Sequence, residues 1–217
     1  MEPLRVFYSE ALKHFEEAGG SEEDFMWLVG SRLAWFRLYR DEIRLRLRMI
    51  EEVSRRIRGR VLDVGSGTGF PALVMALSGN AEEIVGLEKD PYMVEFSKRL
   101  EKHAPNLRFV EGDFLDRNVK LGKFDTVVFM YVLHDFEPEG FLRQTLEVLR
   151  SGGRVVVADF DLNGLRERVK DIGRAKGLEL FDDISLGRAM SHGKLSGAFL
   201  MVLRRDESEG RANPDAG

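Results

Sequence analysis

Beyond residue 58, short apolar runs alternate with stretches of helical spacing, and this alternation constrains the fold more than any other feature of the 217-residue chain. The runs at 60–64, 83–87 and 124–130 are apolar at most positions instead of every second one. Strands with both faces buried have this pattern, and a helix between successive strands is the usual crossover of a parallel sheet. The pattern therefore predicts a doubly wound α/β domain over residues 59–204.

The remaining elements follow the same alternation. Further strands are predicted at 107–111, 153–158, 178–181 and 197–203, and helices at 71–78, 92–103, 138–149 and 162–176. Residues 205–217 are rich in Glu, Ser, Gly, Asn and Pro, which predicts a disordered tail.

The first 58 residues contain no strand-like run, and their apolar side chains recur every three or four positions. Gly19 and Gly20 mark the end of a first helix, and Ser21 followed by Asp24 resembles a capping box that opens a second one. Residues 1–58 are therefore predicted to form an N-terminal helical extension, which would act as a lid or cap over the substrate.

Composition excludes several kinds of site and partner. The chain has no cysteine, and its four histidines are far apart without metal-ligand spacing, so no metal site is expected. No apolar run approaches the ~20 residues that span a bilayer, and the N-terminus lacks the layout of a signal peptide, so we expect a cytoplasmic protein without a membrane partner. The net charge of −4 argues against bulk nucleic-acid binding. One glutamine among many Glu, Arg and Lys residues is typical of a thermophile.

A glycine-rich turn follows the first predicted strand. Gly65, Gly67 and Gly69 form a G-x-G-x-G pattern, and position 70, where a dinucleotide site has Gly or Ala, holds Phe70. This spacing disfavours a nucleotide pyrophosphate at the helix start. A tight turn without any ligand is the alternative, so the glycines alone do not identify a site.

Two acidic residues follow the next two predicted strands. Glu88 ends the second strand, 21 residues after Gly67, where a carboxylate can accept hydrogen bonds from both hydroxyls of a ribose. Asp113 follows the third strand, where it can accept from an adenine amino group while Phe114 offers apolar surface to the base. A solvated charge and an ordinary polar turn are the alternatives at these two positions.

Together these motifs identify a resemblance. VLDVGSGTG, GLEKD, EGDF, FDTVVFMYVLHD and VLRSGGRVVVADF, in this order, resemble the class I S-adenosylmethionine-dependent methyltransferases over roughly residues 59–204. The resemblance implies a seven-stranded, mostly parallel sheet whose last strand, 197–203, is antiparallel and lies beside 178–181. It also implies S-adenosylmethionine as the cofactor, with Met130 and Tyr131 near the sulfonium. The cofactor-binding residues that it implies are Asp63, Gly65, Ser66, Gly67, Gly69, Glu88, Lys89, Asp113, Phe114 and Met130.

Methyl transfer from a sulfonium is a direct displacement that mainly requires alignment of the acceptor, with a general base only if the acceptor arrives protonated. Leu133-His134-Asp135 followed by an aromatic residue is similar to a stretch in caffeate- and hydroxyindole-type O-methyltransferases, in which the histidine is the base. His134 and Tyr131 are therefore the candidate catalytic residues. The alternative is that His134 caps the next helix or shapes the pocket, and Asp135 is a candidate to orient it.

The methyl acceptor carries no motif. A small molecule is favoured, and its pocket is expected between the N-terminal helices and residues 182–196. The alternatives are an RNA or protein methyltransferase and a non-catalytic cofactor-binding or interaction protein. Nucleic acid is disfavoured because no Asn-Pro-Pro-Tyr-like stretch follows residue 130, although residues 40–60 carry eight arginines that form either an acidic-ligand surface or an ion-paired helix.

Overall fold

The fold is built on one seven-stranded sheet with the order β3-β2-β1-β4-β5-β7-β6. The structure is a computed structural model that describes residues 2–30, 33–191 and 193–206. The five strands β1 to β5 pair in parallel with one another, whereas β7 runs antiparallel to both β5 and β6. The strands are β1 (Arg60–Val64), β2 (Glu83–Glu88), β3 (Leu107–Glu111), β4 (Phe124–Met130), β5 (Leu149–Phe160), β6 (Leu178–Ser191) and β7 (Lys194–Arg205). The predicted fold class, including the antiparallel last strand, is confirmed.

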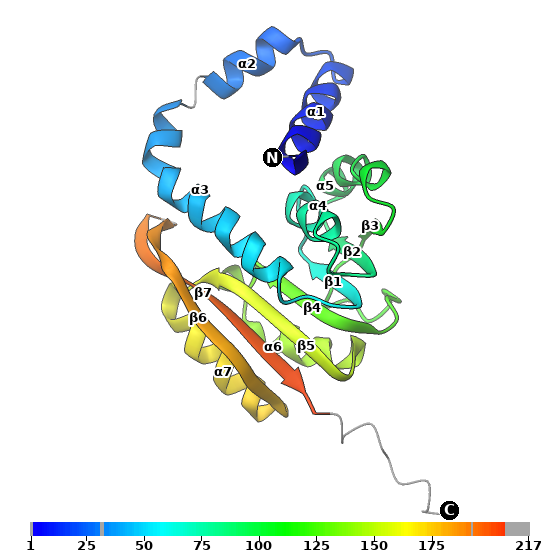
Figure 1. The fold of residues 1–217 in the computed structure, drawn as a ribbon, viewed down its shortest axis with the longest axis vertical. Coiled ribbons are helices and arrows are strands. Elements are labelled where there is room, and N and C mark those ends of the chain that lie inside the picture. Colours follow the sequence, from blue (N-terminus) through cyan, green and yellow to red (C-terminus); the bar gives the residue numbers. More distant parts are fainter. Residues whose placement is uncertain (1, 31–32, 192, 207–217) are drawn as a thin grey trace, which may run out of the picture.

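Helices cover both faces of the sheet (Figure 1). Consecutive residues of β4 alternate between two apolar clusters: Val128 packs with residues of α3 and α4, and Val127 packs with residues of α6 and α7. This division explains why the strands are apolar throughout. The helices are α1 (Glu2–Glu17), α2 (Glu22–Gly30), α3 (Leu33–Ser54), α4 (Phe70–Leu77), α5 (Pro91–Lys98), α6 (Pro138–Val148) and α7 (Leu165–Ala175), with short 3-10 turns η1 (Glu101–His103), η2 (Leu133–Asp135) and η3 (Leu162–Gly164).

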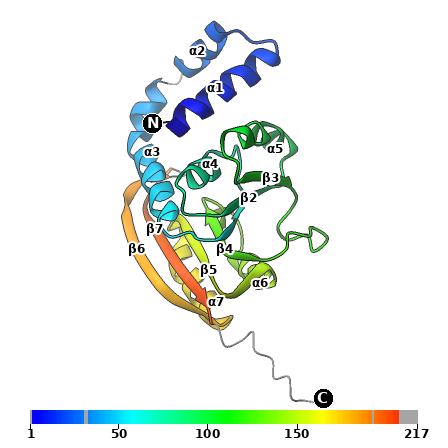
Figure 2. The same ribbon diagram turned by 45° about the vertical axis from the view of Figure 1, so that its right-hand side comes forward.

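The N-terminal extension is an arch of three helices, with α2 far from the sheet and α3 running across one of its faces (Figure 2). The capping box before α2 is present: the Asp24 amide donates to Ser21 Oγ at 3.1 Å, and the Ser21 amide donates to Asp24 Oδ2 at 3.1 Å. Phe7 of α1 packs edge-on against Phe70 and Phe96, with ring centroids 5.3 and 5.4 Å apart. These contacts fix α1 over α4 and α5.

The arginine-rich segment after residue 40 forms ion pairs. Arg46 pairs with Glu42 one turn earlier at 2.6 Å, and Arg56 contacts both Glu52 at 2.6 Å and Asp182 of β6 at 2.8 Å. The ion-paired helix is therefore present, and the last of these pairs ties the end of α3 to the sheet.

The predicted boundaries were wrong at the last three strands, of which β5 spans Leu149–Phe160 instead of 153–158. Strand β6 continues ten residues past its predicted end at 181, and β7 begins at Lys194, so most of the stretch expected as a pocket loop is a long hairpin. Here only Leu186 and Ala189 are buried apolar residues, both packed in the cluster that contains α3, while most of their neighbours are exposed. A strand with one solvated face has no apolar run, and the pattern that revealed the other strands is absent from it.

Smaller differences concern helix ends. The helix predicted to reach 103 ends at Lys98 and is followed by η1, and the one predicted from 162 starts at Leu165 after η3. Arg205 belongs to β7, and the rest of the predicted tail, from 207 onward, lies outside the described residues, as does His192. Among the described residues, no helix combines the length and apolarity that a membrane crossing requires. In the same part of the chain, no three His, Asp or Glu side chains cluster to hold a metal.

Candidate active site

The glycine-rich turn leaves β1 at the carboxyl edge of the sheet. Gly65, Gly67 and Gly69 have φ angles of +69°, +54° and +80°, which favour glycine. The Gly65 amide donates to the carbonyl of Leu87 at 2.8 Å, which ties the turn to β2. A Cβ on Gly65 would lie 2.7 Å from a methyl group of Val132, whereas a Cβ on Gly67 would meet nothing within 4 Å. The turn is therefore packed at Gly65 and open at Gly67, where a ligand can approach the backbone.

Glu88 is fixed at the end of β2. Its Oε2 accepts a hydrogen bond from the Gly67 amide at 2.9 Å, and its Oε1 accepts from the amides of Lys89 and Asp90 at 2.9 and 3.0 Å. Asp90 in turn caps α5 by accepting from the Tyr92 amide at 2.9 Å. The carboxylate is thus held between the glycine turn and the start of α5.

A cavity of about 250 Å³ opens beside these residues. The strand pairing aligns Glu88 with Glu111 of β3, so Asp113 follows at the same edge, where its Oδ1 accepts from the Leu115 amide at 2.8 Å. Of the residues predicted from the sequence, the cavity brings together Gly65, Glu88, Lys89, Asp113, Phe114 and Tyr131. Its other lining residues are Val64, Leu87, Gly112, Leu115, Val132, Asp135, Phe136 and Phe141.

Some predicted residues lie behind the cavity instead of on its wall. Ser66 and Met130 are each 5% exposed, and Met130 packs in the apolar cluster beneath α3 and α4. Phe136 and Phe141 line the cavity but were not singled out from the sequence. Phe141 lies on the apolar side of α6, and this position in the sequence predicts only core packing. Phe136 could have been predicted to line the cavity, because it is an aromatic residue close to the candidate base His134.

Asp63, the buried acidic residue of β1, is 2% exposed. Its Oδ2 accepts no hydrogen bond from any described residue. Burial, and secondarily the charge of Glu88, raises the pKa of Asp63 to about 7. A buried carboxylate without a donor is the arrangement that a bound ammonium would complete, so these residues fit a ligand that carries an amino group.

His134 is held by an aspartate that the sequence reading missed. Its Nδ1 lies 2.7 Å from Oδ1 of Asp159, near the end of β5, and its side chain is 4% exposed. The Nε2 atom lies 3.4 Å from Oδ2 of the exposed Asp135. The hydrogen bond to Asp159 is the main reason why the pKa of His134 is raised, against the opposing effect of burial. Asp159 orients the ring, and the signal for it was an acidic residue directly after the apolar run 155–158.

Tyr131 connects the cavity to α3. It has the left-handed φ of +59°, and its hydroxyl donates to the carbonyl of Arg46 at 2.8 Å. The Arg46 guanidinium lies over the Tyr131 ring at 4.4 Å and near the Phe160 ring at 5.5 Å. Burial is the main reason why the pKa of Tyr131 is raised above that of a free phenol. The hydroxyl is thus a neutral donor committed to α3, which supports a positioning role.

Known proteins resemble this chain in sequence and in fold. A family model described as a methyltransferase domain matches residues 58–201. The demethylmenaquinone methyltransferase of Thermus thermophilus is 31% identical over 121 residues, which is 55% of each chain, so this chain spans about half the length of the curated relatives it matches. The magnesium protoporphyrin IX methyltransferase of Synechocystis, solved with S-adenosylmethionine bound, has a TM-score of 0.61 at 17% identity over 79% of this chain and 89% of that one. The [4+2]-cyclase SpnF has a TM-score of 0.63 at 22% identity over 73% and 81% of the two chains.

Proposed function

The chain belongs to the class I S-adenosylmethionine-dependent methyltransferases, and from that premise we propose that it transfers a methyl group from this cofactor to a small organic acceptor by direct displacement. The observation that carries the proposal is the cavity at the carboxyl edge of the sheet, which Glu88 and Asp113 both line. Next to one of its lining residues, Val64, stands the buried Asp63, whose Oδ2 has no hydrogen-bond partner among the described residues. Open α/β sheets bind their ligands at this edge.

The residues fit the cofactor by chemistry. Asp63 and the turn around Gly67 would hold its ammonium and methionine part, Glu88 its ribose hydroxyls, and Asp113 its adenine amino group, with Phe114 as apolar surface beside the base. When bound, S-adenosylmethionine supplies an electrophilic methyl group on a sulfonium. The chain's part is then to align the acceptor and to exclude water.

His134 is the proposed general base. The hydrogen bond between its Nδ1 and Asp159 leaves Nε2 as the atom that would take a proton from an acceptor hydroxyl. The resulting imidazolium would be stabilised by Asp159, which is fully buried and lies 2.7 Å away. Because the Nε2 atom lies beside Asp135, the acceptor hydroxyl would enter next to that exposed carboxylate.

A small-molecule acceptor is supported by the curated relatives, several of which are demethylmenaquinone methyltransferases at 31–36% identity. The alternative functions are methyl transfer to another class of acceptor and a reaction other than methyl transfer. A putative RNA methyltransferase from Pyrococcus horikoshii and a [4+2]-cyclase both share the fold, at 16% and 22% identity. The test must therefore distinguish acceptor classes and must also detect an absence of methyl transfer.

Two measurements test the proposal. Calorimetry should detect binding of S-adenosylhomocysteine, the demethylated product, and no binding of NAD. Labelled S-adenosylmethionine should then transfer its methyl group to the small-molecule fraction of a cell extract, and not to its RNA or protein fractions. Label in the RNA or protein fraction would replace the proposed acceptor, and binding without any transfer would favour a non-catalytic protein. If S-adenosylhomocysteine does not bind, the cofactor assignment fails.

A further inference from the structure

Three arginines lie at the amino edge of the parallel strands, opposite the edge that carries the glycine turn. Arg154 of β5 stands beside Arg204 of β7 in the strand register, so both side chains project from the same face of the sheet. The register places Thr126 of β4 on the other side of Arg154, and the Thr126 hydroxyl donates to the Arg58 carbonyl at 2.9 Å. We call Arg58, Arg154 and Arg204 the amino-edge cluster.

No carboxylate neutralises the amino-edge cluster within the part of the chain that the structure describes. None of its three arginines forms an ion pair there, whereas the neighbouring arginines do. The neighbouring pairs are Arg56–Asp182 at 2.8 Å, Arg60–Glu83 at 2.6 Å and Arg150–Asp125 at 2.7 Å. Burial, and then the positive charges of Arg58 and Arg204, lower the pKa of Arg154. Like charges on adjacent strands repel one another, and a bound anion would offset this repulsion.

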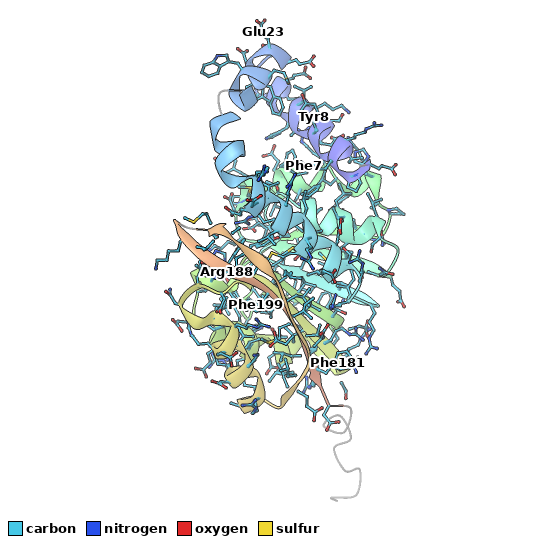
Figure 3. All side chains as sticks on the ribbon, turned by 60° about the vertical axis from the view of Figure 1, so that its left-hand side comes forward. Phe7, Tyr8, Glu23, Phe181, Arg188 and Phe199 are labelled. Atoms are coloured by element: carbon cyan, nitrogen blue, oxygen red, sulfur yellow. The ribbon has the colours of Figure 1, made fainter. Side chains whose placement is uncertain are left out.

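Arg204 has hydrogen-bond donors that no described residue uses. Its guanidinium lies over the ring of Phe181, 3.1 Å from the centroid, and its side chain donates to no acceptor of the described residues. Glu179 of β6, which the register places opposite Arg204, is exposed and forms no ion pair with it. A guanidinium stacked on a ring still directs its N–H groups outward in its own plane. Figure 3 shows Phe181 at the end of the molecule opposite Glu23 of α2, so these donors lie far from the N-terminal arch.

Backbone contacts hold the other two guanidiniums in place. Arg154 Nη1 donates to the Arg56 carbonyl at 2.9 Å, and Arg58 Nη2 donates to the Gly152 carbonyl at 2.9 Å. The other terminal nitrogen of each side chain donates to no acceptor of the described residues. Arg58 is exposed and Arg154 is half-buried, so both can be reached from solvent. Because the two side chains are already ordered, less conformational entropy is lost when a ligand binds them.

We propose that the amino-edge cluster binds a phosphate group of a small molecule. A phosphate group carries more than one negative charge and has three acceptor oxygens, so it suits several guanidinium groups better than a single carboxylate does. The proposal is independent of the proposed methyl transfer, because the cofactor cavity lies at the opposite edge of the sheet.

A nucleic-acid backbone is a less suitable source of the phosphate groups. Such a backbone binds along an extended row of unpaired cations. The arginines that flank the amino-edge cluster, Arg56 and Arg150, are instead neutralised by carboxylates. The net charge of −4 also disfavours a polyanion, and these features together favour a small ligand.

Calorimetry and thermal unfolding of the full chain test the proposal. The probes are inorganic phosphate and pyrophosphate, and chloride holds the ionic strength constant. Pyrophosphate should bind at a single site, and at about ten times its dissociation constant it should raise the thermal midpoint by about 3–6 °C. Arg204→Met and Arg154→Met should each weaken pyrophosphate binding by at least about tenfold, the usual scale of a charge-assisted hydrogen bond. Arg204→Lys keeps the charge without the planar donors and should weaken binding less.

The next residue of β7 provides a matched control. Arg205 also forms no ion pair with a described residue, but it projects from the opposite face of the sheet. There it donates to the carbonyls of Leu146 and Leu149 at 2.8 and 3.1 Å. Arg205→Met removes the same charge from the same part of the chain and should leave pyrophosphate affinity within about twofold of the wild type.

Three results would overturn the proposal. The first is that neither probe binds, and the second is an equal loss of affinity in Arg205→Met and Arg204→Met, because the attraction would then be diffuse. The third is a single-stranded RNA oligonucleotide that binds more tightly than pyrophosphate and is lost in Arg204→Met, which would assign the cluster to nucleic acid. S-adenosylhomocysteine should bind the wild type and Arg204→Met equally, so a failure of the phosphate site leaves the cofactor assignment in place.

Discussion

Replacing Asp63 by Asn should remove a strongly pH-dependent loss of stability from the ligand-free protein. The pKa of Asp63 is about 7 in the folded protein, against 3.8 for an ordinary aspartate. The folded state holds a proton that the unfolded chain releases, so the free energy of unfolding falls by roughly 1.4 kcal/mol per pH unit from about pH 4 to pH 7. Above pH 7 the ionised carboxylate destabilises the fold by about 4 kcal/mol, and an uncharged amide of the same shape removes this effect.

Urea unfolding of the wild type and of Asp63→Asn at pH 5, 6, 7 and 8 measures the effect. The buried amide adds its own offset of about 1–3 kcal/mol, which does not depend on pH, so the slope of the difference is the diagnostic quantity. Asp171→Asn, at a carboxylate that is 74% exposed, provides the matched control and should follow the wild type at each pH. A stability difference that stays constant between pH 5 and 7 would refute the reasoning.

The same carboxylate should couple cofactor binding to pH. If a bound ammonium ionises Asp63, binding releases a proton, and affinity for S-adenosylhomocysteine falls about tenfold from pH 8 to pH 6. In Asp63→Asn the affinity should be weaker and flat over this range. Calorimetry in buffers of different ionisation enthalpy counts the released proton directly, and an equal count in wild type and variant would contradict the assignment.

Further expectations follow from the same geometry. Glu88→Ala should weaken S-adenosylhomocysteine binding by about 1–3 kcal/mol in calorimetry, and an unchanged affinity would remove this residue from the site. Asp159→Asn should move the acidic limb of the kcat/KM profile to lower pH, because the hydrogen bond that raises the pKa of His134 is lost and only the neutral imidazole is a base; an unmoved limb would exclude His134. Gly69→Ala should destabilise the protein by at least about 1–3 kcal/mol in urea unfolding, since φ is +80° and the new Cβ would lie 2.5 Å from the Phe109 ring; wild-type stability would contradict this geometry. The thermal midpoint should exceed the mesophile range of about 45–65 °C, and a midpoint within that range would exclude a thermophilic protein.

Much of the fold could be predicted because its strands are buried on both faces. A strand such as β4, whose consecutive residues Val127 and Val128 enter different apolar clusters, has a nearly continuous apolar run. The second half of β6 could not be predicted, because only Leu186 and Ala189 in it are buried apolar residues. This part of β6 is a strand because it pairs with β7, and such pairing requires no apolar pattern in the local sequence.

The residues proposed to bind the cofactor could be expected to lie together for a related reason. Gly65 directly follows β1, Glu88 is the last residue of β2, and Asp113 lies two residues after β3. Parallel strands bring these carboxyl ends to one edge of the sheet. The positions of the motifs at the strand ends therefore predict which side chains lie close together, without knowledge of any side-chain contact. Phe136 was missed because it follows η2 and not a strand, so its distance from the other residues depends on how that turn folds back.

The proposed acceptor side, around His134 and Tyr131, could not be predicted from local sequence patterns. Its contacts join residues far apart in the chain: Tyr131 donates to Arg46 85 residues away, and His134 pairs with Asp159 25 residues away. The local sequence does not mark these partners as site residues. Arg46, for example, is one of several arginines in α3, and it forms an ion pair with Glu42. Because α3 also packs on β6, changes in the N-terminal helices can reshape the acceptor side while the glycine turn and Glu88 stay fixed. The acceptor must therefore be identified by experiments on the residues around His134 and Tyr131.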